Sequence, residues 1–490
     1  MNFKKVATPY PNSDYKKGLP DLFNSLTTIF FSILFLCNIS FLCLGFHHQQ
    51  WSFLGLFRIN GFTLLMWAVV SFFSTVVSIY SATYLKGFKY HAHFTSLCFG
   101  FTIAVMFLVA SDHVLALLIS WLLMGLFMSR LIGVDSDWVE AKEASRFSQK
   151  YFLASSILLA VGVLLLAFSS GYYTISIINE VLDGLSTPVL FVSAIFIITA
   201  ALIQSAIYPF HRWLLSAMTA PTPASALMHA GFVNGSGILL TIFAALLLKT
   251  QVLTLLFIVG GITAIISQFT KLLQTNIKQK LACSTIAQMG FMIMQCGLGF
   301  FNAAVVHLIL HGFYKAYLFL SSGENIQASV PQKPLPIRIK PLQAVAVMVA
   351  GILGAFIFAR LTGKGTSLNS GIFLTLIVAI TVGQATYNIV KQSALSNTQK
   401  VFLPILLFPF GIACYALIYN RVTLLMKDMP YVDMPSSISL IQLLFGAVFL
   451  AGFFIMKLGV YKKVPWIYVN LLNISQPYKR TIFMSKNKSI

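Results

Sequence analysis

Long apolar runs constrain this chain more than any other feature. Fourteen stretches are apolar over about twenty residues, the length that an α-helix needs to cross roughly 30 Å of hydrocarbon. They lie at about 22–45, 62–85, 94–110, 114–133, 151–170, 187–208, 226–248, 252–270, 281–299, 302–322, 341–360, 371–390, 401–420 and 437–456. Only 9% of the residues are charged, against about a quarter in soluble domains. We therefore expect an all-α polytopic membrane protein with about 14 transmembrane helices.

Charge placement gives this bundle an orientation and a domain plan. With fourteen spans, 26 of the 33 Lys and Arg residues fall on the side of the N-terminus and six on the opposite side. Because cytoplasmic loops carry the excess of Lys and Arg, both termini are expected to be cytoplasmic, in a bacterial inner membrane. We expect a basic leader at 1–20, a transmembrane domain at 21–458 and a basic tail at 459–490. The tail either lies at the interface, packs on a partner, or is disordered and attracted to anionic lipid.

One stretch near 205–225, SAIYPFHRWLLSAMTAPTPAS, breaks the apolar pattern with Pro209, Pro221 and Pro223. Proline removes a backbone donor and clashes with the preceding turn, so a spanning helix cannot run smoothly through this stretch. Broken helices at membrane depth line cavities in transporters. A proline-rich loop between two ordinary helices is the alternative. His229, six residues beyond the last of these prolines and inside an apolar run, favours a functional break.

The segment FNAAVVHLILHGFYKAYLFLSS carries titratable groups where the bilayer tolerates few. His307, His311 and Lys315 are spaced four residues apart, so they share one helix face over about 12 Å. A lysine at the bilayer centre costs at least about 2.5–3.5 kcal/mol, so it is rare unless it faces the protein interior or a water path. Burial disfavours the charged forms of amines and imidazoles, which suits them to exchange protons near neutral pH. The alternative is that both histidines satisfy backbone groups and Lys315 reaches an interface.

Further polar residues in apolar runs could join a hydrated path. They are Gln204, Gln268, Lys271, Ser284 and Gln288. Taken individually, each of the last four is better explained by a hydrogen bond between helices than by a proton relay. Gln204 lies in the apolar run before the break, and its side-chain amide can orient water but cannot take up and release a proton.

Motifs of soluble enzyme chemistry are missing from the sequence. There is no Walker A motif, no GxGxxG before a helix, no HExxH and no Cys/His cluster, and the six cysteines are scattered through apolar segments. We therefore expect no metal and no cofactor in this chain, and no catalysis by it. The net charge of +21 is explained by basic membrane-protein loops, so nucleic acid is not an expected partner.

Three stretches resemble a known superfamily. HRWLLSAMTAPTPASALMHAGFVNG, NIKQKLACSTIAQMGFMIMQCGLG and VVHLILHGFYKAYLFLSSG are similar to the antiporter-type subunits of respiratory complex I and of Mrp sodium/proton antiporters. With the looser YSATYLKG and SDHVLALLISW, the resemblance covers roughly residues 60–325. Within the superfamily, APTPASALMHAG and AQMGFMIMQCGLG look most like the DabB family, the membrane subunits of DAB inorganic carbon accumulation systems.

The resemblance implies a fold with a broken helix and inverted repeats that the sequence barely shows. It also implies a proton path through His229, His307, His311 and Lys315. Two departures stand out: the family's membrane glutamate falls on Leu122 in SWLL, and its broken-helix lysine falls on Gln204. The absence of both the glutamate and the lysine is self-consistent, because either residue alone would leave an unpaired buried charge. Their absence argues against a full complex I-type pump.

The resemblance further implies a function and a partner. Protons moving inward down their gradient would drive hydration of carbon dioxide, or bicarbonate accumulation, in a large peripheral DabA-like zinc protein related to β-carbonic anhydrases. That protein would dock on the cytoplasmic side and hold the zinc. An ion/proton antiporter or a complex I-type NADH-quinone oxidoreductase membrane subunit is the alternative within the superfamily. A membrane anchor that conducts nothing is the alternative from another class.

Overall fold

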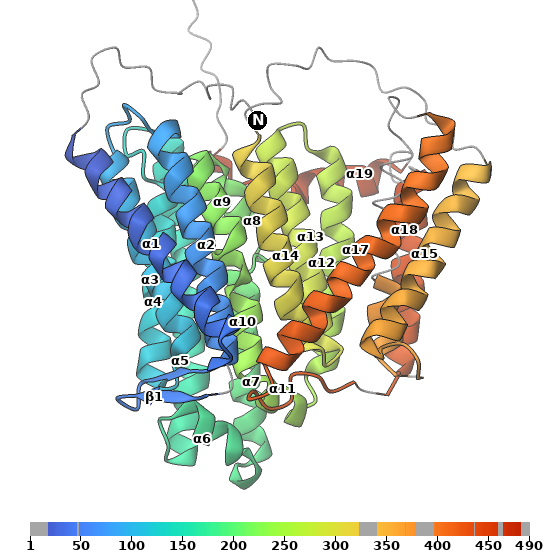
Figure 1. Cartoon of the computed structure of the whole chain (residues 1–490), viewed down its shortest axis with the longest axis horizontal. Helices are drawn as coiled ribbons and strands as arrows, with labels where there is room; N and C mark the ends of the chain where they lie inside the picture. The colour runs from blue at the N-terminus through green and yellow to red at the C-terminus, as the bar shows by residue number, and fades with distance from the viewer. Residues whose placement is uncertain are drawn as a thin grey trace, which may run out of the picture.

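The fold is an all-α bundle of membrane-crossing helices (Figure 1), seen here in a computed structural model. The structure describes residues 18–46, 49–322, 341–367, 369–377, 396–435, 437–458 and 464–481. The first half contains α1 (Leu19–Cys43), β1 (Trp51–Phe53), β2 (Phe57–Ile59), α2 (Gly61–Tyr84), α3 (His91–Ala110), α4 (Val114–Ile132), α5 (Val139–Ser170), α6 (Ile175–Glu180), η2 (Leu182–Gly184), α7 (Thr187–Gln204), α8 (Arg212–Ser216), η3 (Ala217–Thr219), α9 (Thr222–Ala230), η4 (Phe232–Asn234), α10 (Gly235–Ile242) and α11 (Ala244–Lys249). The second half contains α12 (Leu253–Leu273), α13 (Ile277–Gly297), α14 (Phe301–Leu320), α15 (Pro341–Thr362), α17 (Asn397–Leu425), α18 (Leu440–Leu458), α19 (Pro465–Ile474) and η6 (Lys479–Thr481).

The predicted membrane spans correspond closely to these helices. In the described part of the chain, ten helices are long and apolar enough to cross a membrane. Helices α13, α15 and α18 coincide with three more predicted spans. The predicted span at 371–390 falls in part on residues 378–395, which lie outside the described residues, as does most of the predicted leader. The polytopic all-α prediction is confirmed, whereas the exact number of spans and the inverted repeat stay predictions.

The predicted helix break is present. Helix α7 ends at Gln204, the Tyr208–Pro209 peptide is cis, and the chain becomes helical again at Arg212. Pro221 caps α9 and Pro223 sits in its first turn, where a missing N–H costs nothing.

A second interruption lies within the predicted run at 226–248, which forms three pieces, α9, α10 and α11, instead of one helix. Here the Asn234 amide donates to the Ala230 carbonyl at 2.8 Å and so replaces a backbone donor of a continuous helix. The helical run is therefore interrupted just after His229.

Helices α12 and α13 make the closest helix pair. A Cβ added at Gly260 would lie 2.6 Å from the Gly290 carbonyl oxygen, and one added at Gly297 would lie 2.3 Å from the Phe257 nitrogen. Glycine is required at such contacts because only a missing side chain lets two backbones approach this closely, as in other membrane helix pairs. This hairpin holds α13 firmly beside α14.

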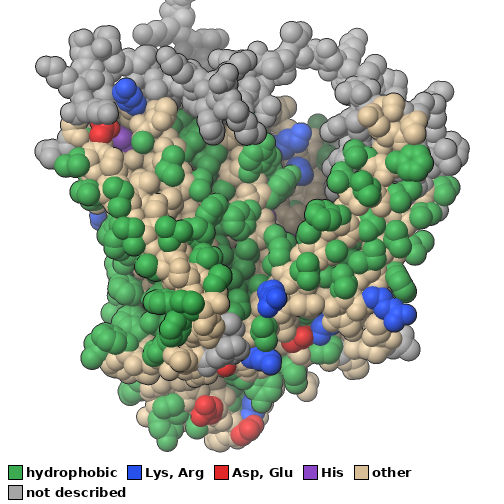
Figure 2. Space-filling model, in the orientation of Figure 1, with side chains coloured by type: hydrophobic (Ala, Val, Ile, Leu, Met, Phe, Trp, Pro, Cys, Tyr) green, Lys and Arg blue, Asp and Glu red, His purple; other side chains and the backbone are tan. Residues whose placement is uncertain are grey.

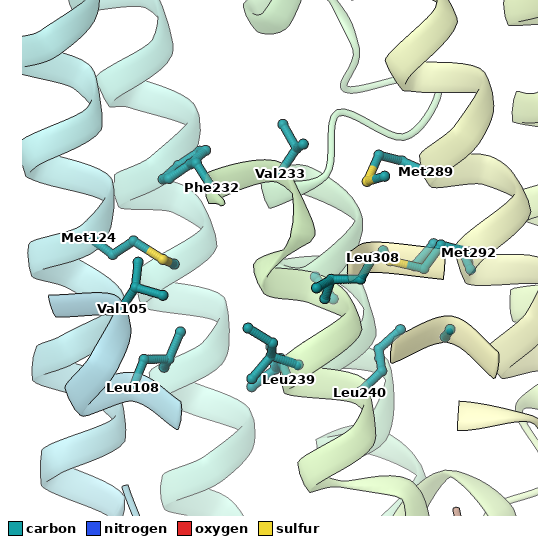
Figure 3. Close-up of a cluster of buried hydrophobic side chains, with 14 of the residues drawn as sticks. Val105, Leu108, Met124, Phe232, Val233, Leu239, Leu240, Met289, Met292 and Leu308 are labelled. Carbon is teal, nitrogen blue, oxygen red and sulfur yellow. The ribbon is translucent and has the colours of Figure 1, made fainter. Parts of the chain in front are cut away.

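A buried apolar layer surrounds α10 in the middle of the bundle. Figure 3 shows Leu239 and Leu240 on α10 between side chains of α3 and α4 on one side and Met292 and Leu308 of α13 and α14 on the other. All four of these side chains are at most 1% exposed. The layer fixes the positions of α10, α13 and α14 relative to the first four helices.

The outer surface suits a lipid environment. On the face in Figure 2, hydrophobic side chains spread over the middle, and acidic side chains gather toward the lower end and one upper corner. Large exposed apolar residues are numerous on α1, α15, α17 and α18, with Leu406 72% exposed. Exposed apolar surface on this scale is expected only where lipid or another subunit covers it.

The two described ends of the chain lie on the same face of the bundle, at the top of Figure 1. The segment after α19 packs there rather than forming a loose tail. The Ile474 carbonyl contacts His211 Nε2 at 2.9 Å, Gln274 donates to the Ser475 carbonyl at 2.9 Å, and the Tyr478 amide donates to Ser216 Oγ at 2.9 Å. This segment, residues 474–481, is called the C-terminal strap below, and it crosses the broken region between α7 and α9.

Candidate functional site

Helix α14 carries the central column of titratable side chains. It packs against α9, α10, α13 and α17, so its interior face is surrounded by protein. The rings of His307 and His311 are 6.2 Å apart, as the spacing of four residues requires. Lys315 follows one turn further on and is fully buried, while His311 is 5% exposed and His307 is half-buried. The predicted row on one interior helix face is therefore what the structure contains.

Lys315 finds a backbone acceptor at its amine. Its Nζ donates to the carbonyl of Leu281 in the second turn of α13, at 3.1 Å. Residues 222–320 contain no Asp or Glu, so no carboxylate from α9 to α14 can pair with this amine. A buried ammonium without a counter-ion is unfavourable, whereas a buried amine that changes its protonation state is a functional-site candidate.

His229 joins the column from α9. It is fully buried, and its ring stacks on Phe319 of α14 with ring centroids 4.3 Å apart. Lys315 and His311 are both close enough to interact with it electrostatically. Among the described residues, neither ring nitrogen of His229 or of His311 has a hydrogen-bond partner. Buried polar atoms are almost always paired, with protein or with ordered water, so these four nitrogens indicate a hydrated site.

The inner end of the column, toward the face of the two described chain ends, is rich in cations. Lys271 on α12 and the Cys283 thiol act electrostatically on Lys315. Lys278, in the first turn of α13, acts on His229 and donates from Nζ to the Ala220 carbonyl at 2.8 Å. Ala220 ends η3, just before Pro221, so this lysine satisfies a carbonyl that the helix break leaves open. Sequence reasoning missed Lys278, although its position in NIKQK, opposite the APTP break, was the available signal.

The remaining predicted polar residues lie around the column at different depths. Gln204 is 1% exposed at the end of α7, and its Nε2 has no hydrogen-bond partner in the described part of the chain. Ser284 is buried one turn after the carbonyl that Lys315 contacts. Gln268 and Gln288 are half-buried on α12 and α13. The structure thus brings Lys271 into electrostatic contact with the column, and within the described residues none of the four others is hydrogen-bonded to a column side chain.

The position of the family's missing glutamate is apolar. Leu122 is half-buried on α4, beside Trp121, which donates from its indole to Ser155 Oγ at 3.1 Å. Ser155 in turn donates to the Ala200 carbonyl at 2.8 Å, which ties α4, α5 and α7 together. This region therefore holds helices together by neutral hydrogen bonds, with no charge at the position of Leu122.

The column has the chemistry of proton exchange. Imidazole and amine groups accept and release protons, whereas hard cations such as Ca²⁺ and Mg²⁺ prefer carboxylate and carbonyl oxygens. The described residues contain no cluster of three His, Cys, Asp or Glu side chains that could hold a metal ion. The site can therefore pass protons between neighbouring groups along α14.

The sequence is similar to those of several membrane subunits. The chain is 35% identical over 319 residues to the probable inorganic carbon transporter subunit DabB of Bacillus anthracis, covering 63% of this chain and 62% of that protein. It is 34% identical to subunit DabB1 of Halothiobacillus neapolitanus, covering 59% and 54%. It is 30% identical to NADH-quinone oxidoreductase subunit L of Campylobacter jejuni, covering 66% and 57%. The chain spans less than two thirds of the length of each of these relatives.

Solved structures share the fold. The Mrp complex from Dietzia sp. aligns with a TM-score of 0.59 at 21% identity, covering 85% of this chain and 51% of that chain. An archaeal membrane-bound sulfane sulfur reductase aligns at 0.55 and 18% identity, covering 94% and 92%. Residues 111–389, more than half of the sequence, match the family described as NADH:quinone oxidoreductase/Mrp antiporter, transmembrane. This chain belongs to that family.

Proposed function

We propose that this chain conducts protons across the membrane through the α14 column. The observation that carries the proposal is Lys315, a fully buried amine with a backbone carbonyl as its hydrogen-bond partner and no carboxylate within α9–α14. Such a residue is costly in lipid unless protons reach and leave it. His311 and His229 stand next to it with unpaired ring nitrogens, which supplies neighbours for the transfer.

The proton is the favoured ion because the column has no site for a metal cation. Sodium or calcium would need several oxygen ligands in place of its hydration shell. The spans from α9 to α14 offer imidazoles and amines, and no carboxylate. The chain itself is proposed to carry out no catalysis and to hold no cofactor.

The names of the relatives support a role in inorganic carbon accumulation. Relatives at 31–35% identity from several bacteria are named probable inorganic carbon transporter subunits. On that basis, inward proton movement is coupled to carbon dioxide hydration or bicarbonate accumulation in a peripheral DabA-like zinc protein on the cytoplasmic side. The two described chain ends share one face (Figure 1), which would be cytoplasmic in a bacterial inner membrane because 26 of the 33 Lys and Arg residues are predicted there.

Replacement of Lys315 by methionine tests proton conduction. Methionine keeps the length of the side chain and removes the exchangeable proton, so we expect Lys315→Met to abolish growth rescue of a carbonic-anhydrase-deficient host in ambient air. The amount of membrane complex recovered through a tag on this chain should stay near normal. Lys89→Met is the matched control, because Lys89 is surface-exposed and pairs only with exposed Asp137. If Lys315→Met gave full rescue, proton conduction through the column would be excluded, and the role of a membrane anchor would remain.

A second candidate is a subunit of an ion antiporter or of a complex I-type oxidoreductase. It is supported by the relative named NADH-quinone oxidoreductase subunit L at 30% identity. The absence of a carboxylate at Leu122 and of a lysine at Gln204 weighs against it. Identification of the proteins that co-purify with the native chain separates the two: a large zinc protein supports carbon accumulation, and a set of redox or antiporter subunits supports the second candidate.

A further inference from the structure

A row of hydroxyl groups on α17 lies outside the column described above. Tyr415, Tyr419 and Thr423 are spaced four residues apart on α17, so they share one face over about 12 Å. Tyr419 is 2% exposed, and both tyrosine rings pack against Phe358 of α15. We call these three residues the hydroxyl ladder. Because α17 packs against α14, the ladder lies beside the outer half of α14.

Asn302 connects the ladder to α14. Its amide nitrogen donates to Tyr419 Oη at 3.0 Å and to Thr423 Oγ1 at 2.8 Å, while its own oxygen accepts the Ala303 amide at 2.8 Å. Asn302 is fully buried in the first turn of α14. The two bonds from its amide nitrogen hold the ladder against the helix that carries the three titratable side chains.

The inner rung of the ladder and His307 both lie inward of the Asn302 contact. Helices α14 and α17 are antiparallel, so Tyr415, four residues before Tyr419, lies about one turn inward of the Asn302–Tyr419 hydrogen bond along the tilted α17 (Figure 1). His307, five residues after Asn302, lies between one and two turns inward of Asn302 along α14. The Gln295 amide of α13 contacts the Tyr415 hydroxyl. Its Oε1 is buried and has no hydrogen-bond partner among the described residues.

A cavity lies one helical turn beyond the outer end of the ladder. Lys427, one turn beyond Thr423, lines a space of about 380 Å³ on the face opposite the chain ends. Asp428, Glu180 and Asp112 line the same space with the buried amide of Asn179. Asp433, paired with Lys364 at 2.6 Å, acts electrostatically on the Tyr419 hydroxyl. Charged side chains therefore lie within about one turn of the ladder at this end.

We propose that the hydroxyl ladder of α17, held to α14 by Asn302 and ending one turn from the cavity that Lys427 lines, is the branch through which protons pass between the outer face and His307. The proposal rests on the proposed function, because it gives the α14 column its connection to the second surface. Through bridging water, each tyrosine or threonine hydroxyl accepts a proton on oxygen as it releases its own toward the next group, so charge moves while every rung returns to its starting composition. The Thr423 hydroxyl donates to the Tyr419 carbonyl at 2.9 Å, so it turns toward water to take part. The amides of Asn302 and Gln295 orient the rungs and exchange no proton.

The ladder passes protons and excludes metal cations. A hydroxyl is both donor and acceptor, so a row of hydroxyls and bridging water relays a proton without moving an ion. A hydrated cation would need an oxygen-lined pore, and the ladder is packed between the phenylalanine of α15 and the first turn of α14. Carboxylates occur only at its outer end, where they can gather protons from solvent.

The test measures proton flux in proteoliposomes that contain the tagged complex under an imposed pH gradient, read by a pH dye in the lumen. Tyr419→Phe and Tyr415→Phe keep the rings and remove the hydroxyls, so both should slow the flux more than about tenfold. Thr423→Ser keeps a hydroxyl and should conduct like the parent, while Thr423→Val keeps the shape without it and should be slow. Tyr317→Phe, 69% exposed on α14, is the control and should change nothing.

The outcomes separate the ladder from the column. If Lys315→Met stops the flux while Tyr419→Phe, Tyr415→Phe and Thr423→Val all conduct normally, the ladder is overturned and the proposed function stands. If Lys315→Met conducts normally, the proposed function fails, and the connection of the ladder to α14 fails with it. Equal loss in Thr423→Ser and Thr423→Val would mean that packing alone matters there and would also overturn the ladder. The yield and melting temperature of each complex guard against a folding defect.

Discussion

Polar side chains at the two ends of α14 are hydrogen-bonded to different kinds of acceptor. At the inner end, Lys315 and Lys278 direct their amines at backbone carbonyls, those of Leu281 and Ala220. At the outer end, the Asn302 amide nitrogen donates to two neutral hydroxyl groups. The break before α9 frees the Ala220 carbonyl for Lys278, whereas α17 is a continuous helix and presents its side-chain hydroxyls to Asn302. A cation is therefore used at the inner end of α14 and a neutral amide at the outer end.

His311 stands between these two ends, and its replacement tests the comparison most severely. We expect His311→Gln to lower proton flux by at least about 100-fold, because an amide of similar size cannot replace an exchangeable imidazole. Flux into proteoliposomes, with recovery of intact complex, is the measurement. His93→Gln, an exposed histidine at the start of α3, should conduct normally. Normal flux in His311→Gln would mean that protons do not pass between the inner and outer ends along α14.

The sequence predicted the inner end far better than the outer end. His307, His311 and Lys315 lie on one helix, so their spacing alone places them on one face. His229 is brought to them by tertiary packing, and only the resemblance to a known family implied that His229 belongs to the same path. The fold class and the break were readable because apolar runs and prolines act locally on the backbone.

The outer end could not be read from the sequence for a physical reason. Tyr419 and Asn302 are 117 residues apart, and each is an ordinary polar residue within its own helix. Nothing in the local pattern shows that α17 packs on α14. Lys278 was missed for the same reason, since its acceptor Ala220 is 58 residues away. Contacts between distant helices need the three-dimensional structure.

Lys278 gives a sharper and smaller test of the inner end. Lys278→Met removes the bond to the Ala220 carbonyl, which should destabilise the complex by about 1 kcal/mol, within the range measured for hydrogen bonds between membrane helices. Flux should fall several-fold, less than for His311→Gln, because the path groups themselves stay intact. Lys280→Met, exposed two residues later, is the control. A loss as complete as that of Lys315→Met would instead make Lys278 a member of the path.

The smallest effect is expected at the C-terminal strap, which covers the broken region at the inner end only. Arg480 lies 3.9 Å from Glu143 and is mostly exposed, so Arg480→Ala should cost less than about 0.5 kcal/mol. Ser216→Ala should cost more, about 1 kcal/mol, because it leaves the Tyr478 amide without its 2.9 Å acceptor. Melting temperatures of the purified complex rank the two. If the order were reversed, charge rather than backbone hydrogen bonding would hold the strap, and the inner end would depend on surface ion pairs instead of on the carbonyls and amides exposed by its broken helices.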